Sequence, residues 1–162
     1  MSRFTHLSRQ DEPPEVGFVI PLKRILASSH FTATILSHGW NGYNTHFMGK
    51  RTIVHNQDPL QCEGCLALRR IKWSCYIHVL CDGYPRGCVI ELTDVSVKQL
   101  KAIKGDRPSL RGFQIYLTRQ NGMKHGPVEI ALVSIHQDTS DLLRAQDVRP
   151  TLKRLWNLEH LD

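Results

Sequence analysis

A close pair of cysteines with further sulfur and imidazole donors nearby is the feature that most constrains the fold. Cys62 and Cys65 stand in the pattern H-x6-C-x2-C-x9-C, which begins at His55 and ends at Cys75. Two thiolates spaced C-x2-C bind one ion through a tight turn, and Zn²⁺ prefers four sulfur or imidazole ligands in a tetrahedron. The pattern therefore predicts a structural zinc site formed by His55, Cys62, Cys65 and Cys75.

The fourth ligand of this site has alternatives. His78 lies three residues after Cys75, and residues three apart on a strand face opposite ways, so only one of the two is expected to bind. His46 is a more distant candidate. Cys81 and Cys88 are expected to be small buried apolar side chains. A redox role for the C-x2-C pair is disfavoured because no strand-to-helix setting surrounds it.

Alternation of side chains predicts a mainly β domain. The clearest strand covers residues 73–80, in which Trp73, Cys75, Ile77 and Val79 face one way. The pair Asp82-Gly83 marks a hairpin turn after it. Further strands are expected over residues 31–36, 45–48, 51–54, 87–92, 113–119 and 128–135, the last two forming a hairpin around Asn121-Gly122.

One internal helix is expected over residues 95–103, capped by Asp94. A five-stranded OB-like Greek-key barrel has its helix between the third and fourth strands, so the order of elements predicts that fold. An SH3-like barrel or an antiparallel sandwich would give a similar order. The expected organisation is a leader over residues 1–15, an OB-like zinc-containing domain over 16–138 and a helical extension over 139–162, in which Pro150 suits a first helical turn.

The positive charge is unevenly distributed. The chain has 21 Lys and Arg against 15 Asp and Glu, a net charge of +6. Residues 98–124 carry seven basic side chains and one acidic side chain, which equals the whole excess. A basic surface of this kind favours an anionic partner such as nucleic acid, although a charge run is also typical of a solvated face.

Aromatic residues alternate with basic ones in several segments. Proteins that bind single strands combine a cationic groove for phosphates with aromatic faces on which bases stack. The sequence therefore predicts a nucleic-acid-binding surface. Its expected phosphate-binding residues are Arg51, Arg69, Arg70, Lys72, Arg111, Arg119 and Lys124, and its expected stacking residues are Tyr43, Tyr76 and Tyr116.

The layout resembles the zinc-containing OB-fold single-stranded-DNA-binding proteins of phage replication. The resemblance covers residues 31–135 and is carried by His55, Cys62, Cys65 and Cys75. In that family the lone cysteine precedes the close pair, whereas here the close pair comes first. The resemblance implies a protein that binds single-stranded DNA and holds one Zn²⁺.

Most enzyme classes lack their motifs here. The sequence has no phosphate-binding Walker loop, no dinucleotide glycine pattern and no G-x-S-x-G elbow. A His-Asn-His nuclease would need a second C-x2-C pair, and a zinc deaminase would need His-x-Glu. The prediction is a non-enzymatic protein. No stretch has the ~20 apolar residues of a membrane span or the apolar core of a signal peptide, so a cytoplasmic location without membrane contact is expected.

The second hypothesis is a zinc-stabilised protein-interaction adaptor or a regulatory subunit of a nucleic-acid-processing complex. Its basis is the amphipathic segment at residues 152–156, where Leu152, Leu155 and Trp156 recur at helical spacing. Such a helix would offer a surface to a protein partner. Packing of Trp156 onto its own domain is the alternative.

Overall fold

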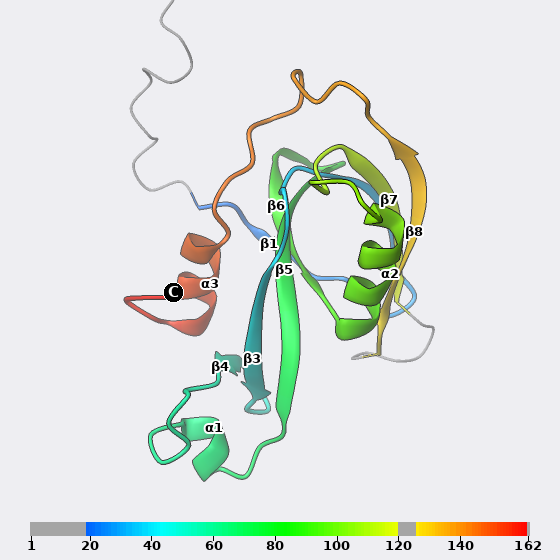
Figure 1. Ribbon diagram of the computed structural model, residues 1–162. Coiled ribbons are helices and arrows are strands. Elements are labelled where there is room, and N and C mark those ends of the chain that lie inside the picture. Colours follow the sequence, from blue (N-terminus) through cyan, green and yellow to red (C-terminus); the bar gives the residue numbers. More distant parts are fainter. Residues whose placement is uncertain (1–18, 120–125, 162) are drawn as a thin grey trace, which may run out of the picture.

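Strands dominate the computed structural model, which describes residues 19–119 and 126–161 (Figure 1). The leader, the turn at Asn121-Gly122 and Lys124 lie outside the described residues. The strands are β1 (Leu22–Lys23), β2 (His30–Ile35), β3 (Asn41–Phe47), β4 (Thr52–Val54), β5 (Ile71–Cys81), β6 (Tyr84–Leu92), β7 (Phe113–Arg119) and β8 (Val128–Ile135). The helices are α1 (Glu63–Leu66), α2 (Asp94–Lys104) and α3 (Arg149–Trp156).

The long strand β5 organises the sheet. It pairs antiparallel with β6 through the predicted hairpin, with β2 at one end and with β3 at the other. Its alternation is confirmed: Cys75, Ile77 and Val79 enter the main hydrophobic core, and Trp73 packs against that core. Tyr76 faces the opposite side, in a second core.

The sheet does not close into the expected barrel. The strand order is β1-β6-β5-β2-β7-β8, with β3 and β4 attached beside β5, so the sheet is open and mixed. β1 pairs in parallel with β6 at Val89 and Ile90, on the edge of β6 that a barrel-closing strand would need. On β8, the backbone carbonyl of Val128 accepts from Ser96 Oγ at 2.6 Å, and the Ile130 N–H donates to Gln99 Oε1 at 2.7 Å. Side chains of α2 thus bind the edge of β8 with which a barrel-closing strand would pair.

The internal helix is confirmed as α2, but its cap is Thr93 and not Asp94. The Thr93 hydroxyl accepts from the Ser96 backbone N–H, and the Ser96 hydroxyl accepts in return from the Thr93 N–H. Because this reciprocal capping box satisfies two N–H groups that a helix start leaves open, it fixes where α2 begins. Val97 and Leu100 then face the core.

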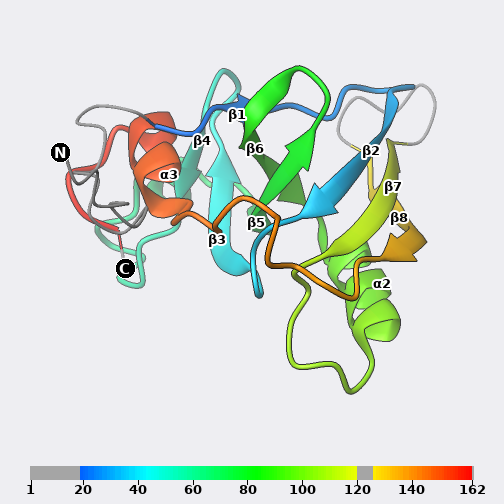
Figure 2. The ribbon, with the colours of Figure 1, turned by 90° about the horizontal axis from the view of Figure 1, so that it is seen from above.

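Two cores lie on opposite faces of the sheet. The larger is filled by β2, β5, β6, β7 and α2, and the smaller is formed by Ile20, Tyr76, Val89, Val148, Leu152 and Trp156. Figure 2 shows α2 and α3 at opposite ends of the sheet. The predicted C-terminal helix therefore packs on the same sheet as the rest of the chain. In the described parts of the chain, no helix combines the length and apolar character needed to span a bilayer.

Candidate metal centre and cationic cleft

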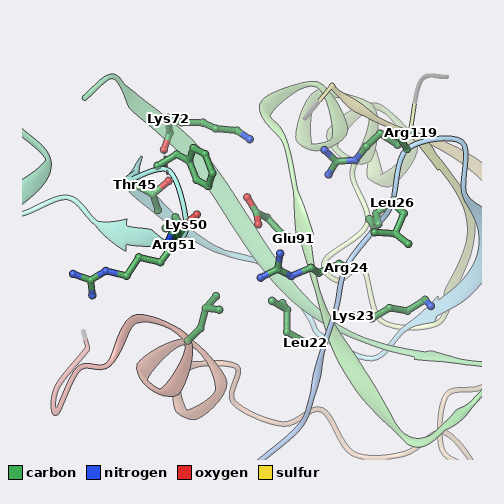
Figure 3. Close-up of a pocket in the computed structure, with 15 residues that line it drawn as sticks. Leu22, Lys23, Arg24, Leu26, Thr45, Lys50, Arg51, Lys72, Glu91 and Arg119 are labelled. Atoms are coloured by element: carbon green, nitrogen blue, oxygen red, sulfur yellow. Dashed lines mark hydrogen bonds between the residues drawn. The ribbon is translucent and has the colours of Figure 1, made fainter. Parts of the chain in front are cut away.

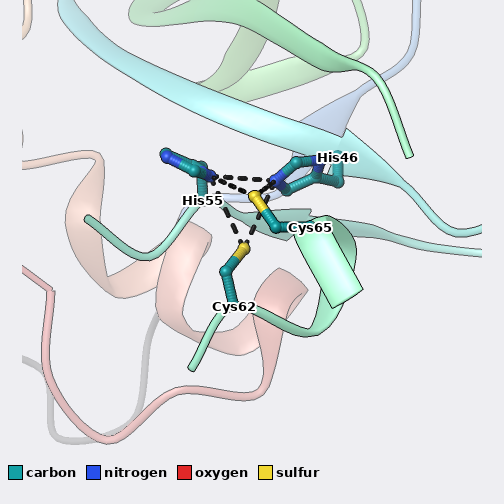
Figure 4. Close-up of side chains that lie close together, drawn as sticks. All are labelled: His46, His55, Cys62 and Cys65. Carbon is teal, nitrogen blue, oxygen red and sulfur yellow. Dashed lines mark hydrogen bonds between the residues drawn. The ribbon is translucent and has the colours of Figure 1, made fainter. Parts of the chain in front are cut away.

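Four side chains that can donate to a metal converge beside the β3–β4 hairpin. One donor atom from each of His46, His55, Cys62 and Cys65 lies within 4.8 Å of all the others (Figure 4). His46 comes from β3, His55 follows β4, Cys62 caps α1 and Cys65 lies within α1. Three separate segments therefore meet at one point.

The spacing between the sulfur and nitrogen atoms matches the edges of a metal tetrahedron. The four distances between a sulfur and a nitrogen of the cluster are 3.3, 3.5, 3.6 and 3.5 Å. Zinc bonds of ~2.3 Å to sulfur and ~2.0–2.1 Å to nitrogen, at tetrahedral angles, place such atoms about 3.6 Å apart. The nitrogens His46 Nε2 and His55 Nδ1 are 2.9 Å apart, closer than the about 3.3 Å of a regular tetrahedron. Two sulfurs and two imidazoles thus surround a space of about the size of one metal ion.

The His46 ring is held in the tautomer that a metal ligand needs. Its Nδ1 lies 3.0 Å from the carbonyl oxygen of Arg69, which is only an acceptor, so Nδ1 carries the proton and donates. Nε2 is then left with a lone pair directed at the cluster. Ligand histidines commonly bind a carbonyl in this way, because the bond fixes ring orientation and raises ligand basicity.

Short polar turns lead the chain into the cluster. Asn56 Oδ1 accepts from the Asp58 N–H, and Asp58 Oδ1 accepts from the Leu60 N–H, each at 3.0 Å. Gly64 then allows α1 to approach β3, because a Cβ at this position would lie 2.2 Å from Cγ of His46. The glycine between the two cysteines is therefore required by packing on the His46 ring.

The two thiols differ in acidity. Burial acts to raise the pKa of Cys62, but the backbone N–H groups of Asn56 and Cys65 and the side chains of Cys65 and His55 outweigh it, and this pKa falls to about 6. Burial and the neighbouring Cys62 both raise the pKa of Cys65. One thiolate is therefore favoured without a metal, and a cation would stabilise the second.

Hydrophobic burial does not explain why this loop folds. Of residues 55–72, only Cys62 and Gly64 are buried. Leu60 and Leu68 are 82% and 93% exposed. A segment with so little buried apolar surface has little to offset its loss of conformational entropy, so a cross-link by a metal ion is the stabilising interaction that its residues offer.

The structure corrects the fourth ligand from Cys75 to His46. Cys75 pairs with Gly42, four residues along β3 from His46, a separation of about 13 Å at ~3.3 Å per residue. It is fully buried in the main core, where burial raises its pKa to about 12. The alternative His78 is buried elsewhere, donating from Nε2 to the Arg86 carbonyl and accepting at Nδ1 from the Gln146 N–H.

A cationic cleft of about 400 Å³ (Figure 3) adjoins the candidate metal-binding loop, residues 55–72, where Arg51 of the cleft contacts Glu63. Successive side chains of β3 face the metal cluster and the cleft in turn. His46 is buried and faces the cluster, whereas its neighbours Thr45 and Phe47 line the cleft. The basic side chains around the cleft are Lys23, Arg24, Lys50, Arg51, Lys72 and Arg119, and Glu91 is the one acidic side chain among the lining residues.

These cations differ in the contacts that they make with other side chains. The Lys23 ammonium lies over the rings of Phe31 and Tyr84, at 4.9 and 5.3 Å from their centroids, so it points away from the cleft. Arg51 contacts the exposed carboxylate of Glu63 at 3.3 Å, a surface pair of small energy. Within the described residues, Arg24, Lys50 and Lys72 form no ion pair. The cleft therefore presents a net positive field to solvent.

Two of the predicted stacking residues are covered by the C-terminal helix. The Trp156 ring lies 5.3 Å from Tyr43 and 5.6 Å from Tyr76, edge-on in both cases. Tyr76 is fully buried, and no hydrogen-bond partner among the described residues reaches its hydroxyl. The expectation that Tyr76 stacks on a base is wrong for this conformation, because α3 covers the face to which the strand alternation directs its side chain.

The remaining predicted residues are scattered. Arg51, Lys72 and Arg119 line the cleft, and Arg69 and Arg70 are exposed beyond α1. Arg111 does not reach the cleft: its guanidinium donates to the carbonyls of Leu36, Thr139 and Leu142. Tyr116 is 37% exposed next to His30, 5.9 Å away, and does not line the cleft. Of the described residues in the basic stretch 98–124, Arg119 is the one that lines the cleft.

Sequence reasoning missed Arg24 and Glu91 in the cleft, which belong to no local motif. Phe47 and Lys50 stand in one of the segments where aromatic and basic residues alternate, but they were not among the expected binding residues. His46 had a usable signal, because pairing of the two short strands expected over residues 45–48 and 51–54 would bring it towards His55. Comparisons with models of known protein families, with curated proteins and with solved structures found no match. Function must therefore be inferred from the geometry of this chain.

Proposed function

We propose that the protein binds single-stranded nucleic acid, preferably DNA, in the cationic cleft without catalysing a reaction, and that a structural Zn²⁺ holds one wall of the cleft. The observation that carries the proposal is the clustering of cations from three strands and two loops around a cleft with a single carboxylate among its described lining residues. Such a groove suits a chain of phosphates. Phe47, 48% exposed and lining the same cleft, offers a ring on which a base can stack.

The position of the cleft supports this ligand class. If β2 with β3 is taken as the first strand of an OB-like fold, then β5, β6, β7 and β8 follow as the second to fifth, with α2 between the third and fourth. OB folds bind oligonucleotides on the face of the second and third strands, between the loops that follow the first and fourth. The cleft includes Lys72 of β5 and Glu91 of β6, residues of the β3–β4 hairpin, and Arg119 at the end of β7.

Zinc is the ion that best fits the donor set. Two thiolates and two imidazoles at tetrahedral spacing are typical of structural zinc sites, in which every coordination position is a protein ligand. His46 and His55 flank the hairpin that carries Lys50 and Arg51. An ion bound by both histidines would therefore fix the position of these two cations at the cleft, which relates metal binding to nucleic-acid binding.

Titration of a fluorescent single-stranded oligonucleotide of about 12 nucleotides tests the proposal. Between about 50 and 200 mM salt, log affinity should fall with log salt by about 0.7 for each phosphate neutralised. Lys72→Ala should weaken binding and make this slope shallower by about 0.7, since it removes one phosphate contact.

Lys98→Ala is the matched control, because Lys98 is an exposed lysine on α2 outside the cleft. It should leave both affinity and slope unchanged. If Lys98→Ala weakens binding as much as Lys72→Ala, the basic stretch 98–124 and not the cleft binds the phosphates. The absence of saturable binding at low salt would show that the proposed function is wrong.

The second candidate is the zinc-stabilised adaptor. Its predicted docking segment is not exposed, because Leu152 and Trp156 are buried against the smaller core. The leucines of the metal-binding loop favour it instead, since Leu60, Leu66 and Leu68 are 82%, 65% and 93% exposed. Loss of a captured protein partner on replacing Leu68 by serine, with oligonucleotide binding unchanged, would support the adaptor.

A further inference from the structure

Glu91 is a carboxylate placed among cations in a cleft that attracts phosphates. Figure 3 shows it projecting into the cleft, with Lys72, Arg24 and Arg119 around it. Within residues 19–119 and 126–161, no salt bridge is formed to it, although the Arg119 guanidinium attracts it electrostatically. A carboxylate at this place lowers the affinity of the cleft for any polyanion, unless the ligand brings a hydrogen-bond donor to it.

The orientation of the Glu91 carboxylate is fixed from one side. The hydroxyl of Ser74, which is fully buried on β5, donates to Oε1 at 2.8 Å. Among the described residues nothing donates to Oε2. The strand pairing holds this arrangement, since Tyr76 is directly opposite Glu91 and Ser74 is the next residue along β5 on the same face as Tyr76. The carboxylate is therefore a preorganised acceptor with one oxygen available to a ligand.

We infer that Glu91 selects bases that carry an exocyclic amino group over thymine. Carboxylates accept from the N4 amino group of cytosine, whereas thymine presents the acceptor O4 at that position, and its one donor on this edge, N3–H, lies between two carbonyl oxygens that repel a carboxylate. Phosphates bind to the surrounding cations in either case, so Glu91 sets base preference and the cations set overall affinity. This inference rests on the proposed function, because it specifies the ligand of the same cleft.

The test compares labelled oligodeoxycytidine with oligodeoxythymidine of equal length, at a mildly alkaline pH that keeps cytosine unprotonated. The natural chain should bind the cytosine strand about 10-fold more tightly, the lower part of the range for one base contact. Glu91→Gln should bring this ratio close to one and raise affinity for thymidine, because it removes the negative charge. Ser74→Ala keeps the charge but frees the carboxylate, so the ratio should fall while the salt slope stays the same.

Glu129→Gln is the control, since it removes the same charge from an exposed position on β8 outside the cleft. It should leave the ratio unchanged. Equal binding of both strands by the natural chain, or a ratio that survives Glu91→Gln in a variant of unchanged melting temperature, would overturn the inference while the proposed function stands. If neither strand binds, the proposed function itself fails.

Discussion

Replacing Gly64 with alanine is expected to weaken metal binding, although Gly64 is not a ligand. The added Cβ would lie 2.2 Å from Cγ, 2.3 Å from Cδ2 and 2.6 Å from Cβ of His46. Ordinary contacts to a Cβ are longer than 3.0 Å, so the ring or α1 must shift by about 1 Å. The ring cannot yield freely, because its Nδ1 donates to the Arg69 carbonyl.

Two effects of opposite sign decide the outcome. Alanine within α1 gains about 1 kcal/mol of helix propensity over glycine. Metal–ligand distances tolerate only about 0.2 Å, so the shift displaces Nε2 from bonding range. Disturbing the support of a ligand alone lowers affinity by about 10–100-fold, or about 1.4–2.8 kcal/mol. The steric loss therefore exceeds the propensity gain.

Competition with a chromophoric chelator measures the zinc affinity of the natural chain and the variant. Gly39→Ala is the matched control, because a Cβ at Gly39 has no atom within 4 Å. The expected result is a loss of at least about 10-fold for Gly64→Ala and no change for Gly39→Ala. If Gly64→Ala keeps its zinc affinity and becomes more stable by about 1 kcal/mol, the described packing of α1 on His46 is wrong.

Three further outcomes follow from the same structure. Cys62→Ser should abolish stoichiometric zinc, measured by elemental analysis, whereas Cys75→Ser should retain it because Cys75 lies in the core. Burial lowers the pKa of His78 below 6.5, so at mildly acid pH the unfolded chain binds a proton that the folded chain does not. Stability should therefore fall as pH drops below about 6.5. Urea midpoints measured at neutral and mildly acid pH should fall less for His78→Gln than for the natural chain. Trp156→Ala should cost about 3–5 kcal/mol in urea unfolding, since the indole is 3% exposed, and a cost below about 1 kcal/mol would show that α3 is loosely docked.

The elements of the fold were largely predictable from local sequence. The strands over 113–119 and 128–135, the internal helix and the β5–β6 hairpin all appear where periodicity indicated them. That the sheet stays open and does not close into a barrel was not predictable in this way, because closure depends on which strand pairs with the second edge of β6. The two-residue strand β1 pairs there, and its sequence carries no alternation long enough to reveal it.

The candidate metal site was predictable in part. The pair Cys62 and Cys65 with His55 follows from spacing, since these donors are close along the chain. The choice between Cys75 and His46 depends on the register of β3 against β5, which places Gly42 and not His46 opposite Cys75. Spacing along the sequence therefore suggested the wrong fourth ligand.

By itself the sequence determined where most of the strands and the internal helix form and which loop carries metal-binding side chains, because periodicity and short-range spacing act within a few residues. Only the tertiary structure decided where the charges gather. The densest basic run contributes little to the cleft, whereas Arg24, Lys50, Lys72 and Arg119, far apart along the chain, meet at its walls. The tertiary structure also decided that Trp156 covers Tyr76, because the exposure of a side chain depends on what packs over its strand as well as on the direction it faces.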